Sequence, residues 1–140
     1  MPGPKKRGYL CLVLHAHLPY VRHPEHEFFL EENWLYEAIT ETYIPLLDTF
    51  FRLVDDNVDF GITLSLSPPL LEMFNDALLR DRYFRHIGRL IELSEREAWR
   101  TRRDIRFGPV AEMYRKRLRA TSRLFDRVFK RDLSSAFRQL

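Results

Sequence analysis

A short, almost continuous apolar run near the start of the chain limits what this sequence can fold into more than any other feature. Residues 9–14 read Tyr-Leu-Cys-Leu-Val-Leu, and the run stops abruptly at His15. A run of this kind is typical of a strand buried on both faces of a parallel sheet. It is far shorter than the roughly 20 residues that cross a bilayer, so we expect no membrane partner. The sequence predicts an α/β fold that opens with this strand.

A long loop and a long helix are expected next. Residues 15–30 contain two prolines and several charged residues and read as a loop. From Asn33, which can cap a helix, apolar residues recur at the helical period as far as residue 54. Pro45 interrupts this pattern, and we expect a kink there.

A second strand follows the helix. Apolar and polar residues alternate over residues 60–67, which is the period of a strand. Ser67 precedes two prolines and is expected to cap a new helix with its side chain. Further helical patterns cover residues 70–79, 81–99, 109–131 and the stretch from 132 onward. The order predicts a helix-rich βαβ unit.

Two strands are too few for a closed fold of this type. The chain has 140 residues, 45% of them hydrophobic, which would suit one domain. Two parallel strands, however, cannot cover each other's faces, and parallel sheets normally have more strands and helices on both sides. We therefore expect residues 1–140 to be the opening portion of a larger α/β domain, with residues 1–8 as a disordered tail. Exposed apolar edges should make this portion marginally stable or prone to aggregate.

Two histidines directly after the first strand are the sharpest candidates for chemistry. In parallel α/β sheets, ligands bind at the carboxyl ends of the strands. If the backbone stays extended, His15 and His17 project to the same side. They could bind a metal ion, contact substrate hydroxyls, carry a proton or simply satisfy buried backbone groups. Three aromatic residues could stack on a sugar ring, although aromatic side chains beside a helix start more often belong to the core: Tyr20, Trp34 and Tyr36. The remaining histidines are expected at the surface: His23, His26 and His86.

Positive charge is concentrated in one segment. Residues 100–131 carry 12 Lys and Arg against 3 Asp and Glu, whereas the whole chain has a net charge of only +3. Such a block could bind nucleic acid, but apolar residues at helical spacing indicate an amphipathic helix with a solvated basic face. We therefore expect no nucleic-acid partner. The basic row comprises Arg115, Arg119, Arg123 and Arg127, and the apolar row includes Val110, Met113, Tyr114, Leu118 and Phe125.

The cellular compartment follows from two further observations. Cys11 is the only cysteine, so the chain cannot form an internal disulfide. Basic residues 5–7 before the apolar run imitate a signal peptide, but no small-x-small cleavage site follows. We expect a cytoplasmic protein.

Four blocks together resemble the start of glycoside hydrolase family 57, and most closely its 1,4-alpha-glucan branching enzyme group. Residues 12–22 read LVLHAHLPYVR, and residues 61–73 read GITLSLSPPLLEM. Between them lie ENWLYEA at 32–38 and ETYIPL at 41–46. The resemblance covers essentially the whole chain. It implies an incomplete (β/α)7 barrel, TIM-like in type, that acts on alpha-1,4-glucans such as amylose or glycogen and retains the anomeric configuration.

The resemblance also implies which residues take part. Retaining chemistry uses a nucleophile and an acid/base carboxyl roughly 5 Å apart. In the family these are a Glu and an Asp on later strands, which we expect beyond residue 140, so no catalytic residue is assigned here. His15 and His17 match a motif that lines the sugar subsite, and Tyr20 adjoins it. The family needs no metal or organic cofactor. Three carboxylates match positions that belong to the structural framework of the family and not to its catalytic pair: Glu37, Glu41 and Glu72.

Three readings therefore compete. The first is the opening segment of a family 57 branching enzyme, inactive alone; other family 57 amylases or 4-alpha-glucanotransferases remain open beside it. A second is a metal-dependent hydrolase of the polysaccharide deacetylase kind, in which a His-x-His pair holds a divalent ion. Its weakness is that no third ligand occurs at a plausible spacing. The third is a small interaction module that uses the basic helix.

Overall fold

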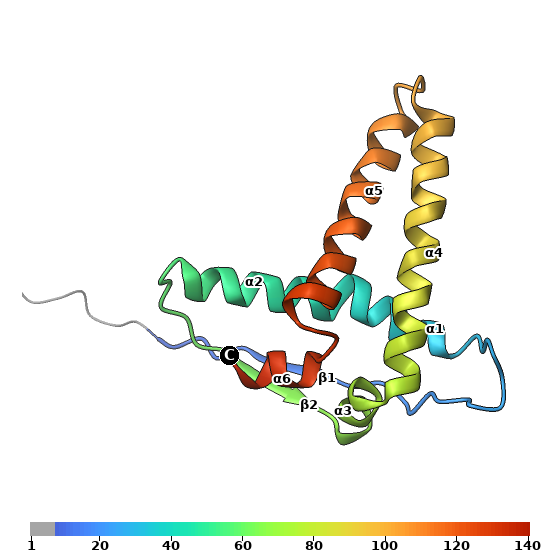
Figure 1. Ribbon diagram of the computed structural model, residues 1–140. Coiled ribbons are helices and arrows are strands. Elements are labelled where there is room, and N and C mark those ends of the chain that lie inside the picture. The colour runs from blue at the N-terminus through green and yellow to red at the C-terminus, as the bar shows by residue number, and fades with distance from the viewer. Residues whose placement is uncertain (1–7) are drawn as a thin grey trace, which may run out of the picture.

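The computed structural model describes residues 8–140 as a small parallel sheet with a larger set of helices (Figure 1). This confirms the predicted helix-rich α/β class. The tail expected over residues 1–8 lies outside the described residues, except for Gly8. The elements in chain order are β1 (Val13–Ala16), α1 (Glu32–Ala38), η1 (Ile39–Tyr43), α2 (Ile44–Asp55), β2 (Thr63–Leu66), α3 (Pro68–Asn75), α4 (Ala77–Thr101), α5 (Phe107–Arg123), η2 (Leu124–Val128) and α6 (Leu133–Arg138).

The first predicted strand is shorter and more exposed than expected. β1 and β2 pair in parallel, with Ala16 opposite Leu66. Val13 is 61% exposed, and the preceding apolar residues from Tyr9 to Leu12 are exposed as well. The expectation of a strand buried on both faces is therefore wrong for this chain, whereas the expectation of exposed apolar edges is confirmed. The part of the chain that the structure describes gives β1 one neighbouring strand, which leaves the apolar run largely uncovered.

The long first helix contains a π-helical segment just before its proline. α1, η1 and α2 follow one another without a break, and Pro45 lies in the first turn of α2. Pro45 has no N–H to donate to the preceding turn, so that turn can widen into the five-residue repeat of a π-helix. The structure thus has a π-helical segment directly before Pro45, and the expected kink at Pro45 stays a prediction. Asn33 does not cap this helix, because Glu31 occupies the cap position.

The break between the next two helices falls at Asp76. Sequence spacing placed it near residue 80, but α3 ends at Asn75 and Asp76 is extended. The Asp76 carboxylate accepts a hydrogen bond of 2.9 Å from the backbone N–H of Leu79, which caps α4. α4 then continues through Gly88 to Thr101. A side chain that can cap α4 therefore decides where the chain turns.

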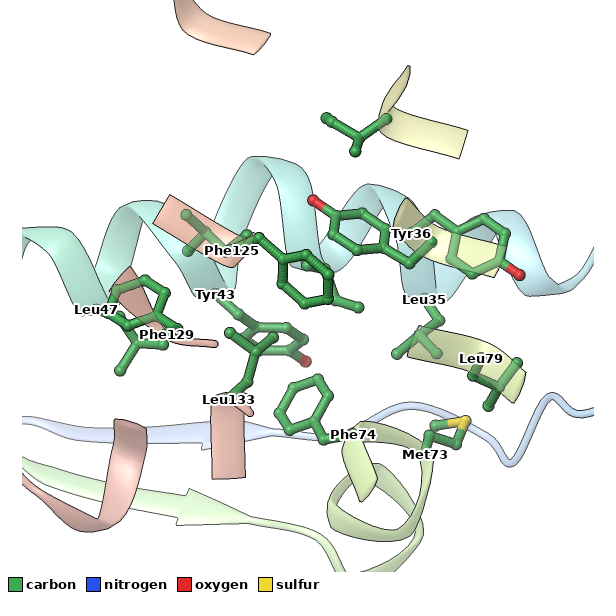
Figure 2. Close-up of a cluster of buried hydrophobic side chains, with 14 of the residues drawn as sticks. Leu35, Tyr36, Tyr43, Leu47, Met73, Phe74, Leu79, Phe125, Phe129 and Leu133 are labelled. Atoms are coloured by element: carbon green, nitrogen blue, oxygen red, sulfur yellow. The ribbon is translucent and has the colours of Figure 1, made fainter. Parts of the chain in front are cut away.

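The core lies where the long first helix meets α3, α4 and the C-terminal elements (Figure 2). Tyr43 of η1 packs edge-on against Phe74 of α3, with ring centroids 5.3 Å apart. Phe125 of η2 meets Tyr83 of α4 in the same way at 4.7 Å. The fully buried aliphatic side chains include Leu35, Ile44, Leu47, Leu70, Leu79, Ile87 and Leu133. Segments far apart in the sequence thus form one core.

Helices α4 and α5 form a hairpin that projects away from the sheet (Figure 1). The predicted basic helix is present, although it begins at Phe107 and passes into η2 after Arg123. Leu118 and Phe125 are buried as expected. The remaining members of the apolar row are about half exposed, because the outer part of the hairpin lies beyond the core: Val110, Met113 and Tyr114.

Carboxylates offset part of the basic face. Arg115 pairs with Glu112 on its own helix at 2.7 Å, and Arg119 pairs with Glu95 of α4 at 2.5 Å. Exposed pairs of this kind add little stability, but they lower the local positive charge.

Among the described helices, none is long and apolar enough to span a bilayer.

Candidate functional site

His15 lies in β1 directly opposite Ser65 in β2, as the parallel register requires. Its Nδ1 atom is 3.2 Å from Ser65 Oγ, so a hydrogen bond joins the two strands at this point. The His15 side chain is exposed. One ring nitrogen is therefore held by the protein, while Nε2 has no hydrogen-bond partner among the described residues.

His17 lies on the same side as His15. The two imidazole rings are nearly parallel, with an angle of 8° between their planes and 6.0 Å between centroids. This confirms the expectation that residues i and i+2 project together from the strand end. His17 is also exposed. The strand end therefore presents two aligned imidazoles to whatever occupies the space beside them.

Tyr20 lies just beyond this pair on an anchored loop. Its side chain is 56% exposed, so its ring is not part of the core. The next two residues fasten the loop: the backbone N–H of Val21 donates to the sulfur of Met73, and Arg22 Nε lies 2.6 Å from Asp76 Oδ2. Burial raises the pKa of Asp76, but the Leu79 N–H and the Arg22 guanidinium outweigh it and hold the pKa below its ordinary value.

Ser67 behaves differently from the sequence-based expectation. Its backbone is extended and precedes α3, with Pro68 in the first turn, so it occupies the predicted cap position. Its hydroxyl makes no capping hydrogen bond, however. The Oγ atom is buried and has no partner among the described residues, while the backbone N–H donates to the carbonyl of Ala16. Ser67 therefore ties the two strand ends together through its backbone.

The other histidines are not all surface residues. Only His26 is exposed, whereas His23 and His86 are half-buried. The His23 ring stacks on Phe29 with a centroid distance of 3.6 Å. Burial and the nearby Arg89 guanidinium lower the pKa of His86, and Glu37 only partly opposes them. The surface assignment is therefore wrong for His23 and His86, because neighbouring aromatic rings cover them.

The carboxylates of the first helix do not act as a pair. Glu41 forms an ion pair with Arg117 of α5, which joins η1 to the hairpin. Glu37 is exposed, and so is Glu72 on α3. Within residues 8–140, no three His, Cys, Asp or Glu side chains are grouped so that they could hold a metal ion.

A buried ion pair was missed by the sequence-based reasoning. Glu32 of α1 and Arg82 of α4 are both buried, with Oε1 and Nη1 2.5 Å apart. Fifty positions separate them in the chain, and neither lies in a pattern that predicts burial. No signal in a single sequence would have paired them.

Comparison with known proteins shows which family the chain belongs to. The profile of glycosyl hydrolase family 57 matches residues 11–132, which is most of the sequence. This chain belongs to glycosyl hydrolase family 57. The two aligned histidines lie inside the matched region, as do both strands.

Among curated relatives in family 57, a 1,4-alpha-glucan branching enzyme of Thermococcus kodakarensis is 42% identical over 92 residues. The aligned part covers 65% of this chain but only 13% of that enzyme. A probable 1,4-alpha-glucan branching enzyme of Mycobacterium tuberculosis is 36% identical over 69 residues, which are 49% of this chain and 13% of that protein.

Solved structures show the same fold over almost the whole chain. An alpha-amylase from Thermotoga maritima is 43% identical with a TM-score of 0.87. The Thermococcus kodakarensis family 57 branching enzyme, crystallised with glucose, is 30% identical with a TM-score of 0.85. Each alignment covers 96% of this chain, against 25% of the amylase and 24% of the branching enzyme. The chain thus spans about a quarter of the length of these relatives.

Proposed function

We propose that this chain supplies part of the sugar-binding site of a 1,4-alpha-glucan branching enzyme. The observation that carries the proposal is the pair of exposed, nearly parallel imidazoles of His15 and His17 at the carboxyl end of β1. Such an end is the place where α/β enzymes bind their ligands. Membership of family 57 and the likeness to two proteins named as branching enzymes support the choice of an alpha-1,4-glucan as partner.

The site chemistry suits recognition of sugar hydroxyls. A neutral imidazole has one donor and one acceptor nitrogen, and either can bond a hydroxyl group. Ser65 engages Nδ1 of His15, which leaves Nε2 to contact the ligand. The exposed ring of Tyr20 offers an apolar face on which a glucose ring can pack. These residues bind and orient a sugar.

The bond-breaking groups must come from elsewhere in the full enzyme. Retaining transfer needs a nucleophilic carboxylate and an acid/base carboxyl roughly 5 Å apart. The side chains that we place in the site carry imidazole, phenol and hydroxyl groups. We infer that the nucleophile Glu and the acid/base Asp belong to strands beyond residue 140. The greater length of the Thermococcus kodakarensis branching enzyme and of the Thermotoga maritima amylase supports this inference.

We further infer that β1 and β2 are the first two strands of a (β/α)7 barrel. The exposed apolar side chains of β1 support this, since further strands and helices would bury them. A barrel also brings side chains from several strand ends to one site. The single cysteine, exposed in this structure, supports a reducing, cytoplasmic location.

Hydrolysis is a second candidate for the reaction. The Thermotoga maritima structure is that of an alpha-amylase, and it is 43% identical to this chain. Branching and hydrolysis share the first half of a retaining reaction and differ in the acceptor, which is a glucan hydroxyl or water. The products distinguish them: new alpha-1,6 linkages or shorter linear chains.

A calorimetric titration with maltoheptaose tests the binding proposal. We expect weak, saturable binding by the wild-type chain, reduced at least fivefold in His15→Ala and in His17→Ala, because each variant removes one hydrogen-bonding ring. His26→Ala is the matched control, since His26 is exposed and its ring packs on Phe29 rather than on either histidine of the pair. Cellopentaose, with beta linkages, should bind less well. Equal affinity in all four proteins would refute the proposed site.

An assay on amylose tests the division of roles. The purified 140-residue chain should produce neither alpha-1,6 linkages nor shortened chains, as followed by the anomeric proton signals. Either product would place a working carboxylate pair within this chain.

A further inference from the structure

The loop that follows β1 is hydrogen-bonded to the buried ion pair between Glu32 and Arg82. Both side chains are almost completely removed from solvent: Glu32 is 1% exposed and Arg82 is 7% exposed. A buried charge is strongly unfavourable unless it is paired and hydrogen-bonded, and every side-chain polar atom of this pair except Arg82 Nε has a partner among the described residues. Most of the additional hydrogen bonds come from one segment, the loop that follows β1.

Arg82 donates hydrogen bonds to two backbone carbonyl groups of the loop. Its Nη1 donates to the carbonyl of His23 at 3.1 Å as well as to Glu32, and its Nη2 donates to the carbonyl of His26. A guanidinium can reach three acceptors in this way because its donors are arranged in a rigid, planar fork. A lysine ammonium has no such fork.

Glu32 completes the arrangement from the other side. Its Oε1 accepts a hydrogen bond of 3.1 Å from the backbone N–H of His23, and its Oε2 accepts one of 2.8 Å from the Tyr36 hydroxyl. Both backbone polar groups of His23 are thereby bonded to one ion pair. Tyr36 in turn fixes the orientation of the carboxylate.

The clamped segment begins three residues after Tyr20. Between them, Val21 is buried with its N–H on Met73, and Arg22 is paired with Asp76. The loop from His17 to His26 is therefore fastened at its far end by Glu32 and Arg82. Val21 and Arg22 anchor the same loop nearer the strand, and the His23 ring also stacks on Phe29 and has its Nε2 atom 3.3 Å from Glu31 Oε2.

We propose that Glu32 and Arg82 are positioning residues for sugar binding. They hold the loop that carries Tyr20 and directly follows the imidazole pair of His15 and His17. This inference rests on the proposed function of the strand end. It adds two residues that touch no sugar but determine the geometry of those that do.

The test uses the full chain with Arg82→Lys and Glu32→Gln. Each variant keeps a side chain of similar length, but lysine loses the fork and glutamine loses the charge. Arg85→Lys is the matched control, because Arg85 lies on the same helix but is exposed, and its one ion pair among the described residues is with Asp81. The readouts are amide hydrogen exchange, the NMR order parameters of residues 17–23 and maltoheptaose affinity.

In both variants we expect exchange at the His23 amide to rise about tenfold, as for a locally opened hydrogen bond. The order parameters of His17 and Tyr20 should fall and maltoheptaose affinity should drop about fivefold, while protection at Leu47 and Ile87 is retained. Arg85→Lys should match the wild type in each readout. Glu32→Gln preserves the test if Arg82→Lys does not fold.

Two results would overturn the positioning role. One is uniform loss of protection, including Leu47 and Ile87, because that would describe a purely structural pair. The other is unchanged order at His17 and Tyr20 although His23 has opened. A wild-type chain that does not bind maltoheptaose would refute the proposed function instead, and the order parameters would still decide whether the clamp exists.

Discussion

The Nδ1 atom of His15 lies 3.2 Å from the Oγ atom of Ser65, its register partner on the neighbouring strand. This hydrogen bond couples strand pairing to the orientation of one imidazole in the candidate site. It also allows the role of a ring nitrogen to be tested without removing the ring.

Replacing Ser65 should therefore affect binding more than stability. In Ser65→Ala we expect the free energy of unfolding to change by less than about 0.5 kcal/mol, because the bond is exposed. Maltoheptaose affinity should fall about threefold, and the 15N shifts of His15 should indicate a new tautomer balance. Thr63→Val is the control, since it removes a hydroxyl two residues earlier on the same strand. Identical affinity in the two variants would show that Ser65 does not orient the ring.

Acid should weaken the link between the loop and α4 through Asp76. The pKa of this carboxyl is lowered in the folded protein, so its stabilising effect is complete above the ordinary value of 3.8 and is lost as the pH falls below it. Asp76→Asn keeps the cap but loses the ion pair with Arg22. The variant should be about 1 kcal/mol less stable at pH 7, and the difference should shrink below pH 4. Urea unfolding at pH 7, 5, 4 and 3 measures this, and a pH-independent difference would contradict it.

Replacing Gly108 or Gly88 with alanine should change the stability of the protein in opposite directions. A Cβ atom at Gly108 would lie 2.9 Å from the backbone carbonyl oxygen of Thr101, so the turn between α4 and α5 would have to shift. We expect Gly108→Ala to cost about 1 to 2 kcal/mol. At Gly88, inside α4, a Cβ would meet nothing within 4 Å. Gly88→Ala should stabilise by about 0.5 to 1 kcal/mol. Thermal unfolding of both variants checks the signs, and destabilisation by both would contradict the helical environment of Gly88.

The exposed apolar strand should make the chain associate. Leu10 and Val13 are exposed near a sheet edge that has no partner strand within residues 8–140, and such an edge is a common site of self-association. Sedimentation velocity at rising concentration should show oligomers, and Leu10→Lys with Val13→Lys should reduce them. Trp99→Lys with Ile105→Lys provides the control, because these residues are equally exposed but lie at the tip of the hairpin. A wild-type chain that stays monomeric throughout would disprove this.

Local pattern predicted the parts of the site that depend on local geometry. The alternation of side chains along an extended strand was enough to place His15 and His17 together, and residues 60–67 showed the strand period. Both inferences use neighbours two positions apart, where backbone geometry dominates.

Features that depend on distant contacts could not be predicted in this way. Glu32 and Arg82 pair across 50 positions, and nothing in either local sequence marks a buried charge. The burial of β1 was mispredicted for a related reason: an apolar run shows that a segment favours burial but not whether partners are present. Asp76 was missed as a cap because Leu70 to Leu79 formed a continuous helical pattern.

The two imidazoles at the end of β1 are the core of the proposed glucan-binding site. The most direct test follows the ring signals of 13C-labelled histidines during a titration with maltoheptaose. We predict that His15 and His17 shift along one common saturation curve while His26 stays fixed. If neither ring responds at saturating sugar, or if all three respond alike, the strand end is not the glucan-binding site.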